Sequence, residues 1–360
     1  MTRDRSTLGP ADLVREEILA LKAYHVAPAT GMIKLDAMEN PYRLPEPLRE
    51  EIGRVVSTLA INRYPDPEAP ELKARLREVF GIPAEAGLLI GNGSDEIIAM
   101  VTQALARPGA VLLAPDPSFA MYRMNALYTR MQYVGLPLNR DFTLDVGRFL
   151  EAIAEHRPAL TFIAYPNNPT GNLFPEEAVE RIIEAAPGFV VLDEAYHAFA
   201  RKTFMTRLGA NPNLMVMRTV SKIGLAGVRL GYAAAAPEWI REIDKVRPPY
   251  NVNVLTQFVV ERLLAHAGAL EQQAERIRSE RAALYDHLRD LRGVEAFPSD
   301  ANFILVRVPD ADAVNERLKA RRILVRNFNG SHPLLANCLR LTVGTPGENE
   351  LMLDALTASL

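Results

Sequence analysis

The sequence predicts an α/β protein in which helices cover a large, mostly parallel sheet and a smaller α/β unit accompanies it. Between residues 69 and 219, short apolar runs alternate with stretches of helical periodicity. These runs are apolar throughout, as expected of strands that are buried on both faces of a parallel sheet. The chain has 360 residues, and single cores stop growing near ~250–300 residues, so a second unit is expected.

Composition and charge exclude several classes of function. The sequence is 48% hydrophobic and 24% charged, as in an ordinary globular protein, and its net charge of -3 argues against nucleic acid as the main partner. No stretch resembles a transmembrane helix or a signal peptide. The single cysteine, Cys338, cannot form an internal disulfide. We therefore expect a cytoplasmic protein with no metal site and no membrane partner.

The amino-terminal part is less regular than the rest. Residues 8–22 carry apolar side chains at helical spacing, and residues 24–47 form a proline-rich passage that is long for a loop in a compact domain. We expect that passage to be functional or to lie on a partner surface. A helix at 47–59 follows, and then a turn at 63–67 in which Pro65 holds Tyr64 in an extended backbone.

The regular alternation begins at residue 69. The sequence predicts helices at 69–80, 94–105, 118–127, 145–155 and 175–186, and strands at 88–90, 111–113, 132–136, 160–165, 189–192 and 214–219. Residues 241–290 are helical, with breaks at Pro248-Pro249 and near Gly268. Strands at 303–308, 323–326 and 339–343 and helices at 311–320 and 347–358 complete the chain. We predict a large domain of residues 46–261 and a small domain of residues 1–45 and 262–360.

Lys222 follows the last strand of the large domain, within Thr219-Val-Ser221-Lys222. An amine whose surroundings lower its pKa can form a Schiff base with a carbonyl compound such as pyridoxal phosphate. Arg229 offers a planar cationic fork for a phosphate, and Ser221 offers a hydroxyl. Taken alone, a lysine and an arginine are more often solvated loop residues.

Other polar groups follow predicted strands, and ligands bind at the carboxyl ends of parallel strands. Each has an ordinary structural alternative. Ser94 and Asp95, after two glycines, could bind an anion or cap a helix. Asp193 could pair with a pyridine nitrogen or cap a helix, and Asn168 could contact a ring oxygen or form part of a turn. Phe119 could stack on an aromatic ring or pack in the core.

Two arginines lie in the predicted small domain, Arg326 at the end of one strand and Arg340 inside another. An arginine within an apolar strand needs an anionic partner. That partner is either a substrate phosphate or carboxylate, or a structural carboxylate of the protein.

The motifs together resemble the fold-type I pyridoxal-phosphate enzymes of the aspartate aminotransferase superfamily. The resemblance is carried by Asn168-Pro-Thr-Gly171, Asp193-Glu-Ala-Tyr196, Ser221-Lys222 and Arg229, and it covers nearly the whole large domain. Four stretches are similar to histidinol-phosphate aminotransferases: residues 39–42, 63–66, 91–96 and 337–345. The implied fold is a large domain with a mostly parallel seven-stranded sheet between helices, plus a small α/β domain.

The resemblance implies roles around the pyridine ring. Lys222 would bind the cofactor covalently and move the proton, and Asp193 would pair with the pyridine nitrogen. Asn168 and Tyr196 would contact the phenolate oxygen. Phe119 stands in the ring-stacking place, where many relatives have tyrosine.

The resemblance also implies how anions are held. Ser94, Asp95, Ser221 and Arg229 would bind the cofactor phosphate, although Arg229 follows Lys222 by seven positions where many members have eight. In a homodimer with shared active sites, Tyr64 would reach the phosphate of the neighbouring subunit. The implied substrate-binding residues are Tyr24, Asn40, Arg326 and Arg340.

The implied reaction is amino transfer between L-histidinol phosphate and 2-oxoglutarate, which yields imidazole-acetol phosphate and L-glutamate in histidine biosynthesis. Two alternatives keep the same fold and cofactor: an aromatic amino acid aminotransferase and a threonine-phosphate decarboxylase. A third is a pyridoxal-phosphate-binding regulator without catalysis.

Overall fold

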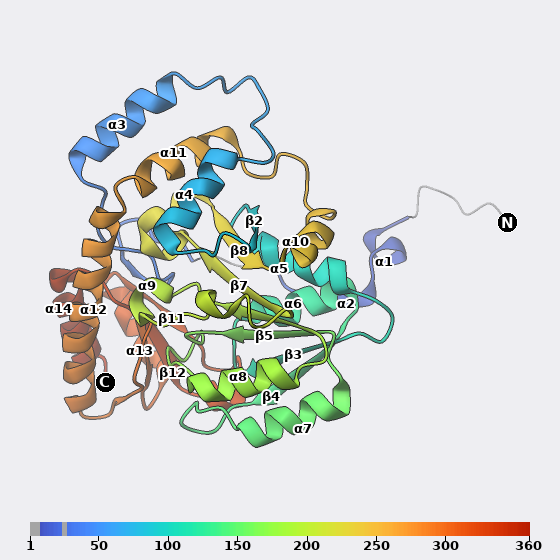
Figure 1. Ribbon diagram of the computed structural model, residues 1–360. Helices are drawn as coiled ribbons and strands as arrows, with labels where there is room; N and C mark the ends of the chain where they lie inside the picture. The colour runs from blue at the N-terminus through green and yellow to red at the C-terminus, as the bar shows by residue number, and fades with distance from the viewer. Residues whose placement is uncertain (1–7, 24–26) are drawn as a thin grey trace.

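Two β-sheets organise the protein, one of seven strands and one of five (Figure 1). The computed structural model describes residues 8–23 and 27–360. The seven-stranded sheet lies in the middle of the molecule, and the five-stranded sheet lies beside the long helix α12 (Ala267–Asp290).

The seven-stranded sheet has the order β2-β8-β7-β6-β5-β3-β4. Its strands are β2 (Gly87–Gly91), β3 (Val111–Asp116), β4 (Gln132–Pro137), β5 (Leu160–Ala164), β6 (Phe189–Asp193), β7 (Leu214–Thr219) and β8 (Gly231–Ala235). Strand β8 runs opposite to the other six strands, so its pairs with β2 and β7 are antiparallel and the remaining pairs are parallel. The predicted mostly parallel sheet is confirmed. Strand β8 was not among the predicted strands, because its sequence Gly-Tyr-Ala-Ala-Ala has no β-branched residue.

Helices cover both faces of this sheet, and each face has its own hydrophobic core. On β6, Val190 and Leu192 pack into one core, while Phe189 and Val191 pack into the other. Strand residues alternate between faces, so this run of apolar residues fills both cores at once. The covering helices are α4 (Pro70–Phe80), α5 (Ser94–Leu105), α6 (Ala120–Thr129), α7 (Val146–His156), α8 (Glu176–Ala185), α10 (Pro237–Asp244) and α11 (Val254–Leu264).

The five-stranded sheet joins the two ends of the chain, in the order β1-β11-β12-β10-β9. Its strands are β1 (Ile33–Leu35), β9 (Glu295–Ala296), β10 (Phe303–Arg307), β11 (Ile323–Asn327) and β12 (Cys338–Thr342), and helices α13 (Ala311–Ala320) and α14 (Pro346–Thr357) pack with it. Strand β1 comes from the passage expected to be irregular. It is three residues long and pairs only with β11. We propose that the two sheets mark the two domains, with boundaries near residues 45 and 261.

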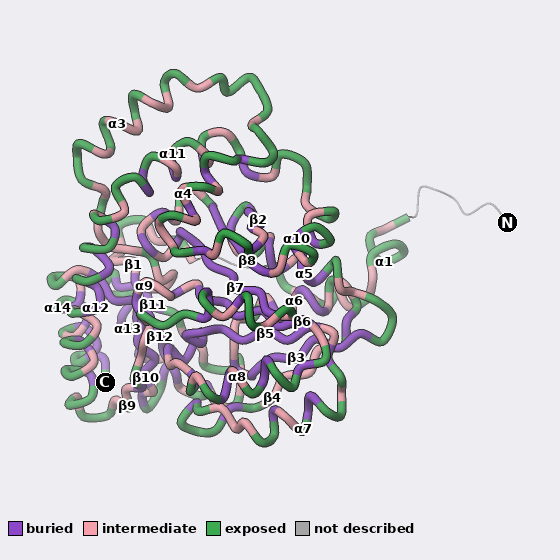
Figure 2. The backbone as a smooth tube through the Cα atoms, in the orientation of Figure 1, coloured by how far each residue is buried: buried purple, intermediate pink, exposed green. Residues whose placement is uncertain are grey.

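The amino-terminal helical pattern is divided in two, α1 (Pro10–Leu13) and α2 (Glu16–Leu19), because the backbone at Val14 and Arg15 is extended. Helix α3 (Glu46–Ser57) lies at the periphery, where it packs against α11, and it has no buried residue, as Figure 2 shows. In the part of the chain that the structure describes, no helix is long and apolar enough to span a membrane.

Candidate active site

A cavity lies at the carboxyl ends of β5, β6 and β7, and the start of α5 closes it on one side. This edge is where ligands bind in parallel sheets. Most residues predicted to hold the cofactor meet there. The lining residues are Met38, Ser94, Asp95, Phe119, Ala164, Asn168, Asp193, Ala195, Tyr196, Thr219, Ser221, Lys222 and Arg229.

Lys222 enters the cavity from an irregular helical turn, Ser221–Leu225, directly after β7. Gly224 has a φ of 121° there, a value that side chains disfavour, and this allows the turn to kink. The Nζ atom donates a hydrogen bond to the carbonyl oxygen of Ala37 at 3.0 Å. Burial, and then the positive charge of Arg340, lower the pKa of Lys222 to about 8. The amine is therefore easier to deprotonate than an exposed lysine, as a nucleophile requires.

Asp193 ends β6 as a buried carboxylate whose hydrogen-bond donors are neutral groups. Its Oδ2 accepts from the hydroxyl of Tyr122 at 2.8 Å, and its Oδ1 accepts from the amide of Ala195 at 3.1 Å. No lysine, arginine or histidine of residues 8–23 and 27–360 forms an ion pair with it. Burial raises its pKa to about 6. A buried carboxylate needs a positive partner, and a protonated ring nitrogen in the cavity would be one, so the site fits the predicted cofactor.

The amino-terminal end of α5 meets Arg229 at one side of the cavity. A Cβ atom on Gly93 would come within 2.7 Å of a terminal nitrogen of the Arg229 guanidinium, and one on Gly231 would come within 2.5 Å of the amide nitrogen of Ser94. The two glycines thus let the guanidinium and β8 approach the helix end. Helix amides and a guanidinium both favour a phosphate. Arg229 reaches the cavity despite the shorter spacing from Lys222.

Hydroxyl and aromatic groups complete the lining. Thr219, which the sequence reasoning did not assign, donates from its Oγ1 to the Oγ of Ser221 at 2.9 Å. The ring of Phe119 packs edge-on against Tyr122, with centroids 5.7 Å apart. Tyr196 directs its hydroxyl toward the sulfur of Met38 at 3.7 Å, and burial raises the pKa of that hydroxyl.

Three residues predicted to bind substrate, Asn40, Arg326 and Arg340, are not among these lining residues. Arg340 is buried and donates to the Oδ1 of Asn168 at 2.5 Å and to the carbonyl of Asp36 at 2.8 Å. Arg326 is exposed on β11, opposite Arg340 on β12. Both guanidinium groups lie near the ring of Phe328, at 5.8 Å and 5.3 Å from its centroid. The two cations therefore share one face of the small sheet.

Three further predicted residues have different surroundings. The side-chain amide of Asn40 donates to the carbonyl of Ile223 at 3.1 Å, so it holds the turn that carries Lys222. Tyr64 is 79% exposed and stacks on Tyr250, with centroids 4.4 Å apart. Tyr24 lies outside the described residues.

A buried ion pair joins β6 and β7 next to the cavity, and the sequence reasoning did not find it. Glu194 accepts from Arg218 at 2.8 Å, from the Thr203 hydroxyl at 2.8 Å and from the Phe204 amide at 2.6 Å. Glu194 and Arg218 directly adjoin Asp193 and Thr219, which line the cavity. The ion pair thus ties together the two strand ends that carry Asp193 and Lys222.

Comparisons with known proteins agree with this geometry. Residues 30–356 match the family "Aminotransferase class I and II". The chain is 57% identical to the histidinol-phosphate aminotransferase of Chromobacterium violaceum over 96% of its length and 97% of that protein. It is 54% identical to histidinol-phosphate aminotransferase 1 of Ralstonia nicotianae, with coverages of 97% and 94%. Among solved structures, the histidinol-phosphate aminotransferase of Sinorhizobium meliloti in complex with pyridoxal-5′-phosphate superimposes with a TM-score of 0.86 at 25% identity, covering 96% of each chain.

Proposed function

This chain belongs to the class I and II aminotransferase family, and we propose that it moves the amino group of L-histidinol phosphate to 2-oxoglutarate in histidine biosynthesis. The products would be imidazole-acetol phosphate and L-glutamate. The observation that carries the proposal is the cavity in which Lys222 and Asp193 lie together, next to a small-domain face with two arginines. The relatives named for this activity, which are more than half identical, favour this substrate over the aromatic and decarboxylase alternatives.

The cofactor is pyridoxal 5′-phosphate, which when bound supplies an aldehyde and an electron-withdrawing ring. Lys222 is the proposed attachment point and proton carrier, because its lowered pKa makes a neutral amine accessible near neutral pH. Asp193 would keep the ring nitrogen protonated. Tyr196 and Asn168 would donate to the ring oxygen, and Phe119 would cover the ring.

The proposed phosphate set is the α5 terminus with Ser94 and Asp95, together with Ser221 and Arg229. All four of these residues line the cavity. Arg229 is half exposed and lies 3.9 Å from the nearest carboxylate, that of Asp95. Its guanidinium is thus only loosely paired and remains available to a second anion.

Arg326 and Arg340 are the proposed substrate-anion residues, with Asn40 and Tyr24 as further contacts. Two guanidinium groups on one face repel each other unless an anion lies between them. A phosphate monoester and a carboxylate both match the planar fork of arginine, so one face can accept each substrate in turn.

We also infer a cytoplasmic homodimer with shared active sites. Helix α3 has no buried residue in the single chain, and Ile61 and Tyr64 are exposed beside it by 73% and 79%. Exposed apolar groups clustered in this way favour a protein–protein contact. In that dimer, Tyr64 would contact the cofactor phosphate of the partner subunit.

Steady-state kinetics with matched donors test the function. We expect kcat/KM for histidinol phosphate to exceed that for histidinol, phenylalanine and threonine phosphate by at least about 100-fold, or about 2.7 kcal/mol. Arg326→Met should reduce the preference for histidinol phosphate over histidinol. The control Arg321→Met changes an exposed arginine at the carboxyl end of α13, before β11, and should leave this preference unchanged. Faster turnover of phenylalanine, or carbon dioxide release from threonine phosphate, would contradict the proposed substrate.

A further inference from the structure

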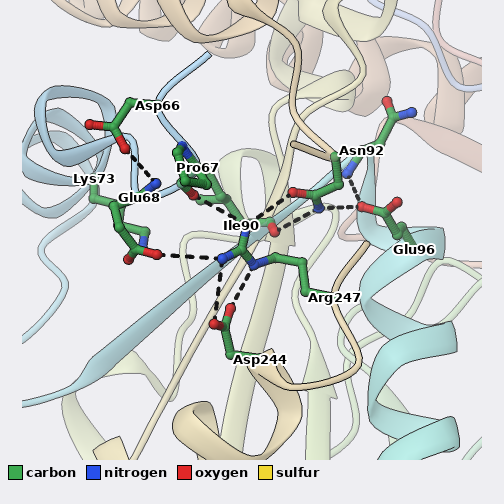
Figure 3. Close-up of polar contacts among 10 residues, drawn as sticks. Asp66, Pro67, Glu68, Lys73, Ile90, Asn92, Glu96, Asp244 and Arg247 are labelled. Atoms are coloured by element: carbon green, nitrogen blue, oxygen red, sulfur yellow. Dashed lines mark hydrogen bonds and ion pairs between the residues drawn. The ribbon is translucent and has the colours of Figure 1, made fainter. Parts of the chain in front are cut away.

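The connection between α10 and α11 contains Arg247, whose side chain is only 9% exposed. Figure 3 shows its contacts with Asp244, Glu68 and Pro67. Its Nε lies 2.6 Å from the Oδ1 of Asp244, and a second nitrogen lies 3.4 Å from the other oxygen of that carboxylate. This two-point contact fixes the plane of the guanidinium. The remaining N–H groups point to two other parts of the chain.

Through Asn251, Arg247 is connected to the loop before α5. Arg247 donates to the Oδ1 of Asn251 at 3.5 Å, and the Asn251 amide donates to the Oε2 of Glu96 at 2.6 Å and to the carbonyl of Ile90 at 3.3 Å. The same Glu96 oxygen accepts from the backbone amide of Asn92 at 2.6 Å. Glu96 lies in the first turn of α5, directly after the two residues that line the cavity.

The other part is the turn that carries Tyr64. Arg247 donates to the carbonyl of Pro67 at 3.2 Å and lies 3.5 Å from a carboxylate oxygen of Glu68. Three residues after Arg247, Tyr250 stacks on the ring of Tyr64 at an angle of 15°. Tyr250 has a φ of 56°, which is costly for a tyrosine, so its contacts must outweigh that strain.

We propose that residues 247–251 form a positioning segment for the cofactor phosphate, with Arg247 and Asn251 as its positioning residues. Neither lines the cavity, so both act through other groups. The segment holds the amino-terminal end of α5 in its own subunit and fixes the orientation of Tyr64. In the proposed dimer, Tyr64 contacts the cofactor phosphate of the neighbouring subunit. This second role depends on the proposed dimer. One short segment thereby shapes the phosphate sites of both subunits.

The physical reason is preorganisation. Helix amides bind a phosphate strongly only if they already point at it, because ordering a loop on binding costs conformational entropy. Glu96 accepts from the Asn92 backbone amide and from the Asn251 side chain, so the turn between Asn92 and Glu96 is held before the cofactor arrives. Loss of Arg247 removes the cation that orients Asn251. It also leaves two carboxylates, those of Asp244 and Glu68, without this partner.

Binding of pyridoxal phosphate and of pyridoxal to the cofactor-free protein separates this role from general stability. Arg247→Met should raise the Kd for pyridoxal phosphate about 10-fold, equivalent to about 1.4 kcal/mol, and leave the Kd for pyridoxal within about 2-fold. The ³¹P resonance of the bound cofactor should shift. The control, Lys245→Met, removes an exposed pair with Glu242 and should change neither constant.

Asn251→Ala tests the same link without removing the cation, and serves if Arg247→Met does not fold. It should also weaken the phosphate-bearing cofactor selectively. Equal losses for pyridoxal and pyridoxal phosphate, or no loss in a folded variant, would overturn the proposal. Both readouts are independent of the amino-acid substrate, so they do not depend on whether histidinol phosphate is the donor.

A double-mutant cycle with Tyr64→Phe tests the second connection. If Arg247 acts partly by orienting Tyr64, the two changes together should cost less phosphate affinity than the sum of the single changes. Simple additivity would remove Tyr64 from the proposal.

Discussion

Replacing Asp193 with asparagine should make the cofactor-free protein more stable while it weakens cofactor binding. In the structure this carboxylate is buried, and burial raises its pKa from 3.8 to about 6, with a smaller contribution from the negative charges of Asp95 and Glu194. A raised carboxyl pKa means that the folded state binds a proton more tightly than the unfolded state does. Ionisation therefore destabilises the fold as the pH rises from about 4 to about 6.

The magnitude follows from the two pKa values. A difference of about two pKa units at about 1.4 kcal/mol each gives a destabilisation of about 3 kcal/mol at pH 7 and about 1.5 kcal/mol at pH 5. Asparagine has nearly the same shape and no charge. We therefore expect Asp193→Asn to raise the free energy of unfolding of the cofactor-free protein by up to about 3 kcal/mol at pH 7, and by about half as much at pH 5.

Urea unfolding of the cofactor-free protein at the two pH values measures this difference. Asp141→Asn is the control, because two contacts from Thr143 lower the pKa of that exposed carboxyl, so its loss should not stabilise the protein. Asp193→Asn should also weaken pyridoxal phosphate binding and reduce turnover by at least about 100-fold, or about 2.7 kcal/mol. A less stable variant at pH 7, or an equal gain at both pH values, would refute the reasoning.

Three further predictions concern the neighbours of this carboxylate. Arg340→Met should raise the pKa of Lys222 above about 8, because it removes a positive charge that lowers this pKa. The pH dependence of Lys222 acetylation in the cofactor-free protein measures the pKa, and an unchanged midpoint would contradict the prediction. Phe119→Ala should weaken cofactor binding by about 1 kcal/mol in a fluorescence titration, whereas Phe119→Tyr should stay close to the parent; equal losses would argue against stacking. Arg218→Met should lower the free energy of unfolding by about 3–5 kcal/mol because it leaves Glu194 buried and unpaired, and adding Glu194→Gln should recover part of that loss in urea unfolding.

Residues at or just beyond the carboxyl ends of strands could be placed from the sequence. Asp193 and Lys222 come after apolar runs, and parallel strands bring such ends to one edge of a sheet. For these residues the local sequence pattern and the sheet topology agree, so the alternation of apolar runs and helical stretches was sufficient to predict their position. The same logic failed for β8, where Gly-Tyr-Ala-Ala-Ala has no local preference for a strand and is extended only because it pairs with β2 and β7.

Contacts between distant segments could not be predicted. Tyr122 reaches Asp193 from 71 positions away, and Arg340 reaches Asn168 from 172 positions away. Their side chains carry no periodic or motif signal that names a partner. The sequence offered one clue, a carboxylate directly after four apolar residues, because a buried carboxylate needs a hydrogen-bond donor nearby.

The positioning segment illustrates the same limit. The sequence marks Pro248-Pro249 as a helix break and nothing more. The contacts of Arg247 with the Pro67 carbonyl, and of Asn251 with Glu96, exist only because α10 packs beside β2 and α5 in the folded chain.

Borohydride reduction of the cofactor-loaded protein tests the central claim most directly. The reagent makes the bond between the lysine amine and the cofactor permanent, and peptide mass spectrometry then locates the label. We expect one labelled residue, Lys222, and no label in Lys222→Ala. A label on another lysine, or an unlabelled Lys222 in a protein that retains the cofactor, would contradict it.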